Sequence, residues 1–323
     1  MSNATQSQTN ISVGLEYRGL LERVVLSTLT TLPCCVFLFI NGIMLFTLRS
    51  KLVFRETSRY ILLFNLLCAD TMQMALSQLL YLLAACRITV TYPLCGVLVM
   101  LAILTKEISP FTLVVMSLER YVAVCYPLRH TTIITMRNTT VAIFAVWGFG
   151  SLNMLTRVIL LLDFPFEDLE SLQMTDYCGS YMILLGPMSD LYNKGYTYFL
   201  FVSAGGAITC TYIGVTIAAR SASTDKASAR KARNTLLLHA VQLGLSLSSF
   251  MYSFFLVAAS KVVTRITLER IRNVCYVFVI ILPKCLSSLI YGLRDQTIRY
   301  ALVYHLCCRL KLSVHTAKAQ VSP

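Results

Sequence analysis

The sequence predicts an all-α integral membrane protein, built as a seven-transmembrane helix bundle. Composition is the first observation: 56% of the 323 residues are hydrophobic and 13% are charged, whereas soluble domains average about 45–50% and about 25%. A soluble surface of this length needs more ionised side chains. A disordered or collagen-like chain is excluded as well, because apolar content is high and only 14 residues are Gly and 8 are Pro.

Seven apolar segments are the second observation. Each is long enough to cross a bilayer, which takes about 20 mostly apolar residues in a helix. The third is longer than this, so we expect it to tilt or to project beyond the membrane. The segments are 24–48, 59–85, 94–126, 139–162, 196–220, 232–260 and 270–292.

The distribution of Lys and Arg predicts the orientation. Basic residues gather at 49–59 and 220–233, and the excess of Lys and Arg marks cytoplasmic connections. The connection 163–190 has six acidic residues and neither Lys nor Arg. We therefore expect the N-terminus outside and the C-terminus in the cytosol. The predicted parts are an extracellular segment (1–23), the transmembrane domain (24–292) and a cytoplasmic tail (293–323) with a short amphipathic helix.

The N-terminal segment lacks the basic and then apolar pattern of a cleaved signal peptide. The first span then acts as its own insertion signal. Asn3 and Asn10 each begin an Asn-x-Ser/Thr acceptor for glycosylation on the outer side. Asn138 begins the same pattern, but it falls in a cytoplasmic connection and should stay unmodified.

Cysteine spacing and the distribution of charge argue against a zinc site and against nucleic-acid binding. The twelve cysteines do not pair with His at zinc spacing, and most lie inside apolar runs, where a free Cys behaves as a small hydrophobe. The net charge of +13 could indicate nucleic acid, but the basic residues sit in short connections between spans. We expect no metal, no cofactor and no nucleic-acid partner.

Four stretches have more specific spacing, and together they resemble rhodopsin-like G-protein-coupled receptors, in particular odorant receptors of the fish type. The most specific is Ser117–Leu128, SLERYVAVCYPL, which is similar to the DRYVAICxPL stretch of that family. The others are Leu66–Asp70, Lys231–His239 and Leu289–Arg294. The resemblance covers about residues 35–300. One departure is Ser287-Ser288, where the family usually has Asn-Pro.

The resemblance implies a G-protein switch at the inner end of the third span. Arg120 would be held by Glu119 at rest and would turn toward the G protein when active. From the residues alone, this pair can equally be charges that snorkel to the interface, and a lone His near a helix end is usually structural. The residues implied in the switch are Glu119, Arg120, Tyr121, Tyr212, His239 and Tyr291.

The resemblance also implies a disulfide between Cys95 and Cys178, which would tie the acidic outer loop to the third span. Two free thiols are the alternative. An oxidising compartment outside the cell favours the bond.

Two adjacent ionisable residues, Lys106 and Glu107, lie in the outer half of the third span. Adjacent residues are about 100° apart around a helix, so they cannot share one direction. Ionisable groups inside a membrane are candidates for a functional site, although a structural ion pair is the alternative. The ligand-binding residues implied by the resemblance are Ile103, Lys106, Glu107, Tyr196, Phe250, Met251 and Phe254. This mixture favours a small ligand with one ionic or hydrogen-bonding group.

An internal ion pair is predicted between Asp70 and Lys284. Asp70 and Ser109 resemble two members of a sodium pocket in rhodopsin-like receptors, and Lys284 would put an ammonium where sodium would bind. Two like charges repel strongly at low effective dielectric. The alternative is that Lys284 snorkels or is neutral, because a buried Lys can lose its proton.

The predicted function is therefore a chemosensory receptor with no enzymatic activity. Its expected partners are a small odorant, an olfactory Gs-like heterotrimeric G protein and the lipid bilayer, in the plasma membrane of sensory cilia. A transporter or channel would show internal repeats or broken helices in matching halves, and the sequence shows no repeat. A rhodopsin-like receptor outside olfaction stays open.

Overall fold

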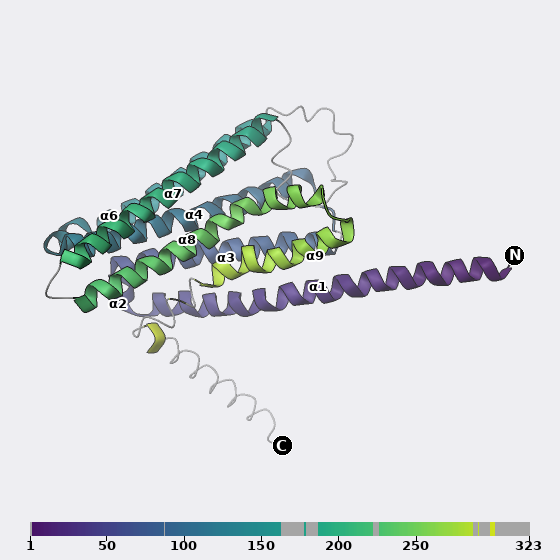
Figure 1. Ribbon diagram of the computed structural model, residues 1–323, viewed down its shortest axis with the longest axis horizontal. Helices are drawn as coiled ribbons and strands as arrows, with labels where there is room; N and C mark the ends of the chain where they lie inside the picture. Colours follow the sequence, from purple (N-terminus) through teal and green to yellow (C-terminus); the bar gives the residue numbers. More distant parts are fainter. Residues whose placement is uncertain are drawn as a thin grey trace, which may run out of the picture.

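The computed structural model describes residues 2–86, 88–162, 178, 187–221, 226–286, 290 and 298–300. The long helices run side by side along one axis (Figure 1). In chain order the α-helices are α1 (Ser2–Ser50), α2 (Leu52–Arg55), α3 (Ser58–Ala85), α4 (Tyr92–Cys125), α5 (His130–Ile133), α6 (Met136–Leu162), α7 (Pro187–Ser221), α8 (Lys226–Ser260) and α9 (Arg265–Cys275). A short 3₁₀ turn, η1 (Pro127–Arg129), precedes α5.

Within the described part of the chain, six helices are long and apolar enough to cross a membrane, and they overlap the first six predicted segments. The seventh segment is helical too: α9 continues into the π-helical segment η4 (Tyr276–Ile281) and then as helix to residue 286. The fold is a seven-helix bundle, as predicted. The apolar spans are Val24–Ser50, Ser58–Ala85, Tyr92–Cys125, Met136–Leu162, Met188–Ala218 and Arg233–Tyr252.

α1 begins at Ser2 rather than at 24. α7 also begins before its predicted segment, at Pro187 rather than at 196. The stretch between these positions is polar, with Ser189, Asp190 and Lys194, so hydropathy alone starts the helix too late. α4 has 34 residues, well above the about 20 that a span needs, as predicted for the third segment.

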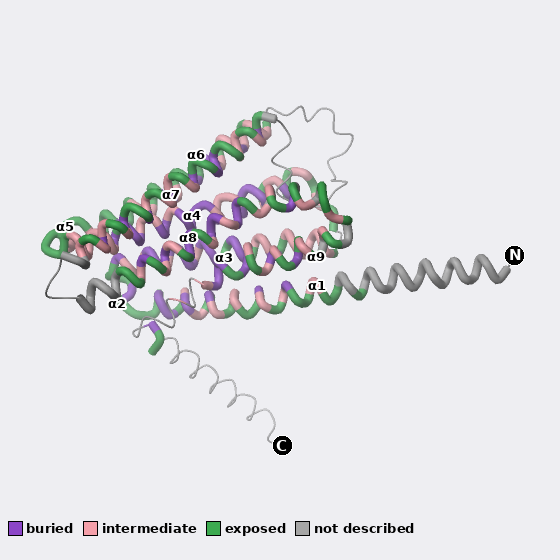
Figure 2. The backbone as a smooth tube through the Cα atoms, in the orientation of Figure 1, coloured by how far each residue is buried: buried purple, intermediate pink, exposed green. Residues whose placement is uncertain are grey.

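The bundle has two ends, which we name by their residues. The disulfide end carries Cys95, at the start of α4, and the adjoining ends of α6, α7 and α9. The Arg120 end carries Arg120 together with α2 and α5, which lie at the opposite end of the long axis in Figures 1 and 2.

α4 lies at the centre and contacts α3, α6, α7 and α8. In its most apolar stretch 61% of the residues are buried, against 22% in α1 and in α6. The outward sides of the peripheral helices are exposed (Figure 2). They carry large apolar side chains, including Phe144 on α6 at 73% and Val202 on α7 at 76%. Apolar surface this extensive is what a bilayer covers. Polar side chains on α4 must therefore find partners inside the bundle.

One such set of partners links three helices in the middle of the bundle. The Asn65 amide on α3 donates to Thr112 Oγ1 on α4 at 3.0 Å, and Trp147 Nε1 on α6 donates to Asn65 Oδ1 at 2.8 Å. The main apolar core packs around this level, with Leu66 of α3 and Leu113 of α4 fully buried. These contacts fix how far α4 is rotated, and so which of its side chains face each neighbour.

Candidate functional site

Glu107 is fully buried on α4 and is held from two other helices. Its Oε2 accepts a hydrogen bond from the Tyr196 hydroxyl on α7 at 2.9 Å, and its Oε1 accepts a short one from the Asn153 amide on α6. Arg157 Nη2, one turn farther along α6, lies 4.0 Å from Oε1. A buried carboxylate needs such partners, since burying it unpaired costs several kcal/mol or more.

Arg157 is 5% exposed and forms the other side of this network. Its Nη1 donates to Asn193 Oδ1 at 3.0 Å. The guanidinium carbon lies 5.5 Å from the ring centre of Tyr192 and 5.6 Å from that of Tyr196, within the range of cation–π attraction. The Tyr192 hydroxyl closes the network by donating to Asn153 Oδ1 at 2.7 Å.

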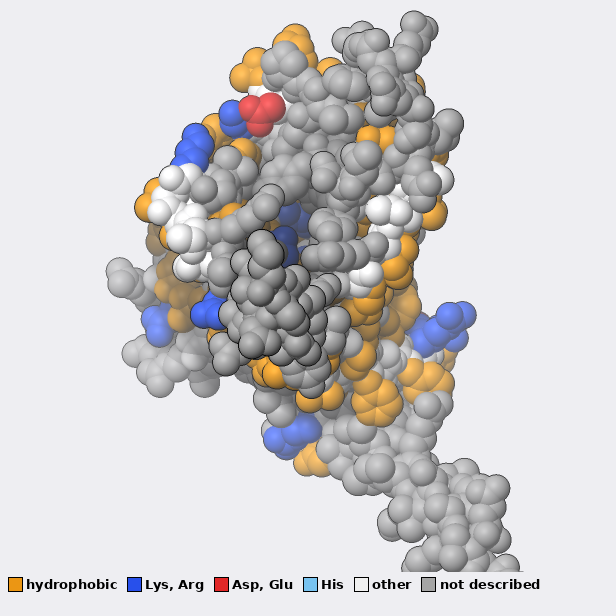
Figure 3. Space-filling view, turned by 90° about the vertical axis from the view of Figure 1, so that its right-hand side faces the viewer, with side chains coloured by type: hydrophobic (Ala, Val, Ile, Leu, Met, Phe, Trp, Pro, Cys, Tyr) orange, Lys and Arg blue, Asp and Glu red, His pale blue; other side chains and the backbone are white. Residues whose placement is uncertain are grey.

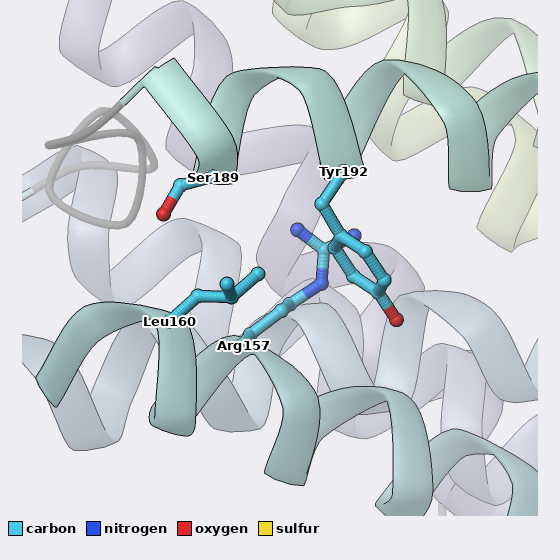
Figure 4. Close-up of a pocket in the computed structure, with 4 residues that line it drawn as sticks. All are labelled: Arg157, Leu160, Ser189 and Tyr192. Atoms are coloured by element: carbon cyan, nitrogen blue, oxygen red, sulfur yellow. The ribbon is translucent and has the colours of Figure 1, made fainter. Parts of the chain in front are cut away.

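A narrow crevice reaches Arg157 between α6 and α7 (Figure 4). Arg157 and Leu160 line it from α6, and Ser189 and Tyr192 line it from α7. The crevice is narrower than a water molecule. Ring and guanidinium lie against each other in this view, so the crevice is a seam in the network rather than a cavity for a ligand.

Lys106 points away from this network, toward α8. Its Nζ donates to the backbone carbonyl of Ser249 at 2.8 Å and lies 4.3 Å from the centre of the Phe250 ring. No ion pair joins Lys106 to Glu107 within the described part of the chain. The two neighbours diverge, as their 100° separation requires.

The other predicted ligand-binding residues divide by exposure. Tyr196 and Phe250 are buried beside Glu107 and Lys106 respectively. Ile103 packs against the buried cluster of the disulfide end. Phe254 is half-buried, and Met251 is 40% exposed, a quarter-turn or so from Phe250 on α8.

The disulfide between Cys95 and Cys178 is present, with its Cα atoms 5.6 Å apart. Both residues are buried and pack with Val99 and Met100 of α4. The bond ties residue 178 to the first turn of α4, which confirms what the family resemblance implied.

Asp70 and Lys284 lie together inside the bundle. Lys284 Nζ is 3.0 Å from Asp70 Oδ1, with Asp70 0% and Lys284 2% exposed. The contact joins α3 to the helix that follows η4. Ser109 is also buried, on α4, but within the described residues no hydrogen bond joins it to either member of the pair.

At the Arg120 end, Arg120 Nε lies 3.2 Å from Glu119 Oε2. His130 Nε2, on α5, lies 3.9 Å from Glu119 Oε1. The Tyr121 ring packs so closely on Gly214 of α7 that a Cβ there would lie 2.5 Å from Tyr121 Cε2.

The remaining residues of the predicted switch differ in burial, and one of them lies outside the described residues. Tyr212 is half-buried on α7, two residues before Gly214, and His239 is 1% exposed on α8. Tyr291 lies outside the described residues, as do the side chains of Asn3 and Asn10 and the tail beyond residue 300.

Comparison with known proteins matches the chain to the family described as 7 transmembrane receptor (rhodopsin family), over residues 25–290. It is also 31% identical over 312 residues to Odorant receptor 131-2 of Danio rerio, covering 95% of this chain and 91% of that protein. The chain belongs to the odorant receptors of the rhodopsin family. The predicted family, the fish type of the resemblance and the absence of enzymatic activity are thereby confirmed.

The receptor is similar to mammalian relatives over a shorter stretch. Olfactory receptor 4E2 of Mus musculus is 24% identical over 210 residues, which is 59% of this chain and 60% of that protein. Olfactory receptor 2A1/2A42 of Homo sapiens is 27% identical over 195 residues, again 59% of this chain and 60% of that protein.

Four residues that organise the receptor's central network were missed from the sequence: Asn153, Arg157, Tyr192 and Asn193. A signal existed for Arg157, because it is an ionisable residue inside a predicted span, the same criterion that singled out Lys106. Tyr192 and Asn193 fall in the polar start of α7 that hydropathy placed outside the membrane.

Proposed function

We propose that the receptor binds a small odorant in the half of the bundle toward the disulfide end and activates a heterotrimeric G protein at the Arg120 end. The observation that carries this proposal is that one central helix bears both sites. Lys106 and Glu107 lie on α4, and Glu119 and Arg120 lie near its other end. Thirteen residues of helix separate Glu107 from Arg120, about 20 Å, so a shift of α4 at one site is felt at the other.

The basic residues support a cytosolic Arg120 end. Lys51, Arg55, Arg129 and Arg137 are all exposed there, and cytoplasmic connections carry the excess of Lys and Arg. The N-terminus would then be outside, where Asn3 and Asn10 meet the glycosylation machinery. Basic loops at that end also suit an acidic surface on the G protein.

In this proposal the Glu119–Arg120 pair is the resting state of the switch. Tyr121, Tyr212, His239 and Tyr291 would support Arg120 once it turns toward the G protein, and the Asp70–Lys284 pair would favour the resting packing. The names of the relatives support odorants as the ligand class. The Gs-like olfactory G protein and the sensory cilia follow from the same likeness.

The test is an odorant panel applied to cells that express the full-length receptor together with an olfactory-type Gs protein. We expect a subset of odorants to raise cAMP, and we expect the rise to vanish in matched cells that lack Gs-type α subunits. An odorant-gated ion flux that persists in those cells would favour a channel and overturn the proposal. Antibody access to an N-terminal epitope on intact cells tests the orientation separately.

A further inference from the structure

Positive charges outnumber negative ones in the interior of the bundle. Between the two ends, the spans contain three cationic residues, Lys106, Arg157 and Lys284, but only two carboxylates, Asp70 and Glu107. Glu119 lies with Arg120 at the far end. All other acidic residues of the sequence fall in the N-terminal segment, the connections, the polar helix starts or the tail.

The ion pairs of the two carboxylates leave the extra positive charge on one residue. Asp70 is 3.0 Å from Lys284, and Glu107 is 4.0 Å from Arg157. Both carboxylates are fully buried. Each is therefore engaged on a side of the bundle away from α8, and Lys106 is the cation left without a carboxylate among the described residues.

The surroundings of Lys106 compensate its charge only in part. The Ser249 carbonyl occupies one of the three ammonium donors, and the Phe250 ring faces another side of the charge. A carbonyl dipole and a ring quadrupole are weaker partners than an anion. Lys106 is also only half-buried, unlike the 2% exposed Lys284, so the described residues leave part of its side chain uncovered.

We propose that Lys106 anchors an anionic group of the ligand, and that the receptor therefore takes small carboxylic acids in their ionised form. The inference rests on the proposed odorant function and specifies its ligand class. The carboxylate would take the free donor of the ammonium, and the apolar body would lie against the aromatic surface that Phe250 presents. Desolvating a lone ammonium beside an amine ligand would cost several kcal/mol, so amines are rejected.

Several cations are exposed at the disulfide end, to which the acidic connection 163–190 also belongs. Lys261, Arg270 and Arg272 are exposed there on or beside α9. Figure 3 looks onto this end and shows blue Lys and Arg side chains around the rim and others set back near its middle.

The experiment uses compounds that share a carbon skeleton and differ in one group: phenylacetate with phenylacetamide and phenethylamine, and hexanoate with hexanamide and hexylamine. Sulfonates of the same skeletons distinguish a general anion site from a carboxylate site. Two readouts run in parallel on the full-length receptor, cAMP in cells and the melting temperature of the solubilised protein, since a ligand that binds the folded state stabilises it.

We expect at least one acid to act at tenfold or more lower concentration than its amide, and the amines to be inactive. Lys106→Met should raise the effective concentration of the acids tenfold or more and leave the amides unchanged. Lys106→Glu should reverse the preference, so that an amine now binds. Lys194→Met is the matched control, because Lys194 is exposed and paired with Asp190 on α7; it should change nothing.

The outcomes separate this inference from the proposed function. Acids that raise the melting temperature without raising cAMP would support the carboxylate site and overturn G-protein signalling. A cAMP response to amides or amines at the same concentrations as the acids would leave the proposed function standing and overturn the site. Equal binding of acids to the wild type and Lys106→Met, or no effect of any acid at millimolar concentration in either readout, would also overturn it.

Discussion

The two carboxylates of α4, Glu107 and Glu119, are twelve residues apart and have opposite kinds of partners. Glu107 is fully buried, and its hydrogen-bond partners lie 46 and 89 residues away in the sequence, on α6 and α7. Glu119 pairs with the adjacent Arg120 and with His130 eleven residues on, and the Arg120 side chain keeps 20% of its surface exposed.

The difference distinguishes two kinds of contact. The network around Glu107 is rigid, and we call it the frame; the Glu119–Arg120 pair can separate, and it is the proposed switch. Partners on two other helices cannot leave Glu107 without moving those helices, so the Glu107 network holds α4, α6 and α7 at fixed positions. The pair at the Arg120 end is less enclosed, with 20% of the Arg120 side chain and 9% of the Glu119 side chain exposed, and partly exposed ion pairs contribute little and are screened by salt. Arg120 can therefore be drawn away by a protein partner without disturbing the bundle. The predictions below test this contrast, from the largest effect on stability to the smallest.

The largest loss of stability is expected for Glu107→Gln. The amide oxygen can still accept from Asn153, and the new NH2 group can donate to the Tyr196 hydroxyl, but Arg157 is left as a buried charge without its carboxylate. Breaking a buried pair in this way costs about 3–5 kcal/mol. The measurement is the unfolding temperature of the solubilised receptor.

The double variant Glu107→Gln/Arg157→Met is the control, because it removes the orphaned charge as well. It should recover most of the loss, giving a strongly non-additive double-mutant cycle. Additive losses would show that Glu107 and Arg157 are not coupled. The network around Glu107 would then not act as a frame.

Lys284→Met comes next, at about 3 kcal/mol, the lower end of the range for a broken buried pair. The expected loss is smaller than for Glu107 because Asp70 and Lys284 connect two helices rather than three. Asp70→Asn combined with Lys284→Met should again recover most of it. If the double variant did not recover the lost stability, Lys284 would be neutral in the wild type.

The same pair predicts a response to sodium. With the Lys284 ammonium beside Asp70, a sodium ion at this place meets repulsion. Agonist potency of the wild type should not change when a bulky organic cation replaces sodium at constant ionic strength, whereas Lys284→Ser should become sensitive to sodium. Strong sodium dependence of the wild type would contradict the tethered cation.

Gly214→Ala probes the packing of the Arg120 end and should cost about 1 kcal/mol, at the low end for overpacking. The new methyl group would lie 2.5 Å from Tyr121 Cε2, but a ring at the edge of the bundle can turn aside. Gly206→Ala on the same helix is the matched control, since nothing lies within 4 Å of its Cβ position. It should be neutral or slightly stabilising through helix propensity.

Much of the fold could be predicted from the sequence because the bilayer imposes it. Every spanning segment must satisfy its own backbone in apolar surroundings, so hydropathy finds the helices. The prediction was less accurate for α7, where Ser189, Asp190 and Lys194 extend the helix beyond the apolar stretch. A polar helix end carries no hydropathy signal.

The site was predicted in part, for a different reason. Lys106 and Glu107 could be singled out because ionisable residues inside a span are rare. Their partners could not be assigned, since those depend on the rotation of α4 against α6, α7 and α8, which Asn65 and the core fix only in three dimensions. The same argument explains why Asp70 and Lys284 could be proposed as a pair: each is the other's nearest opposite charge among few.

Arg120→Ala should have the smallest effect on stability and the largest on signalling. The pair with Glu119 is partly exposed and is made by adjacent residues, so its loss should cost less than about 1 kcal/mol, and the variant should reach the cell surface in nearly wild-type amount. Odorant-evoked cAMP should nevertheless disappear, because in the proposed mechanism this guanidinium is the group that meets the G protein.

Arg137→Ala is the matched control: Arg137 is an exposed arginine at the same end, on α6, and its removal should leave more than half of the response. Surface labelling and cAMP are measured on the same cells. A variant that reaches the surface and signals normally would show that Arg120 is a snorkelling interface charge and not a switch. A variant that fails to reach the surface would show that the Arg120 end is also needed for folding, and the contrast with Glu107 would then be wrong.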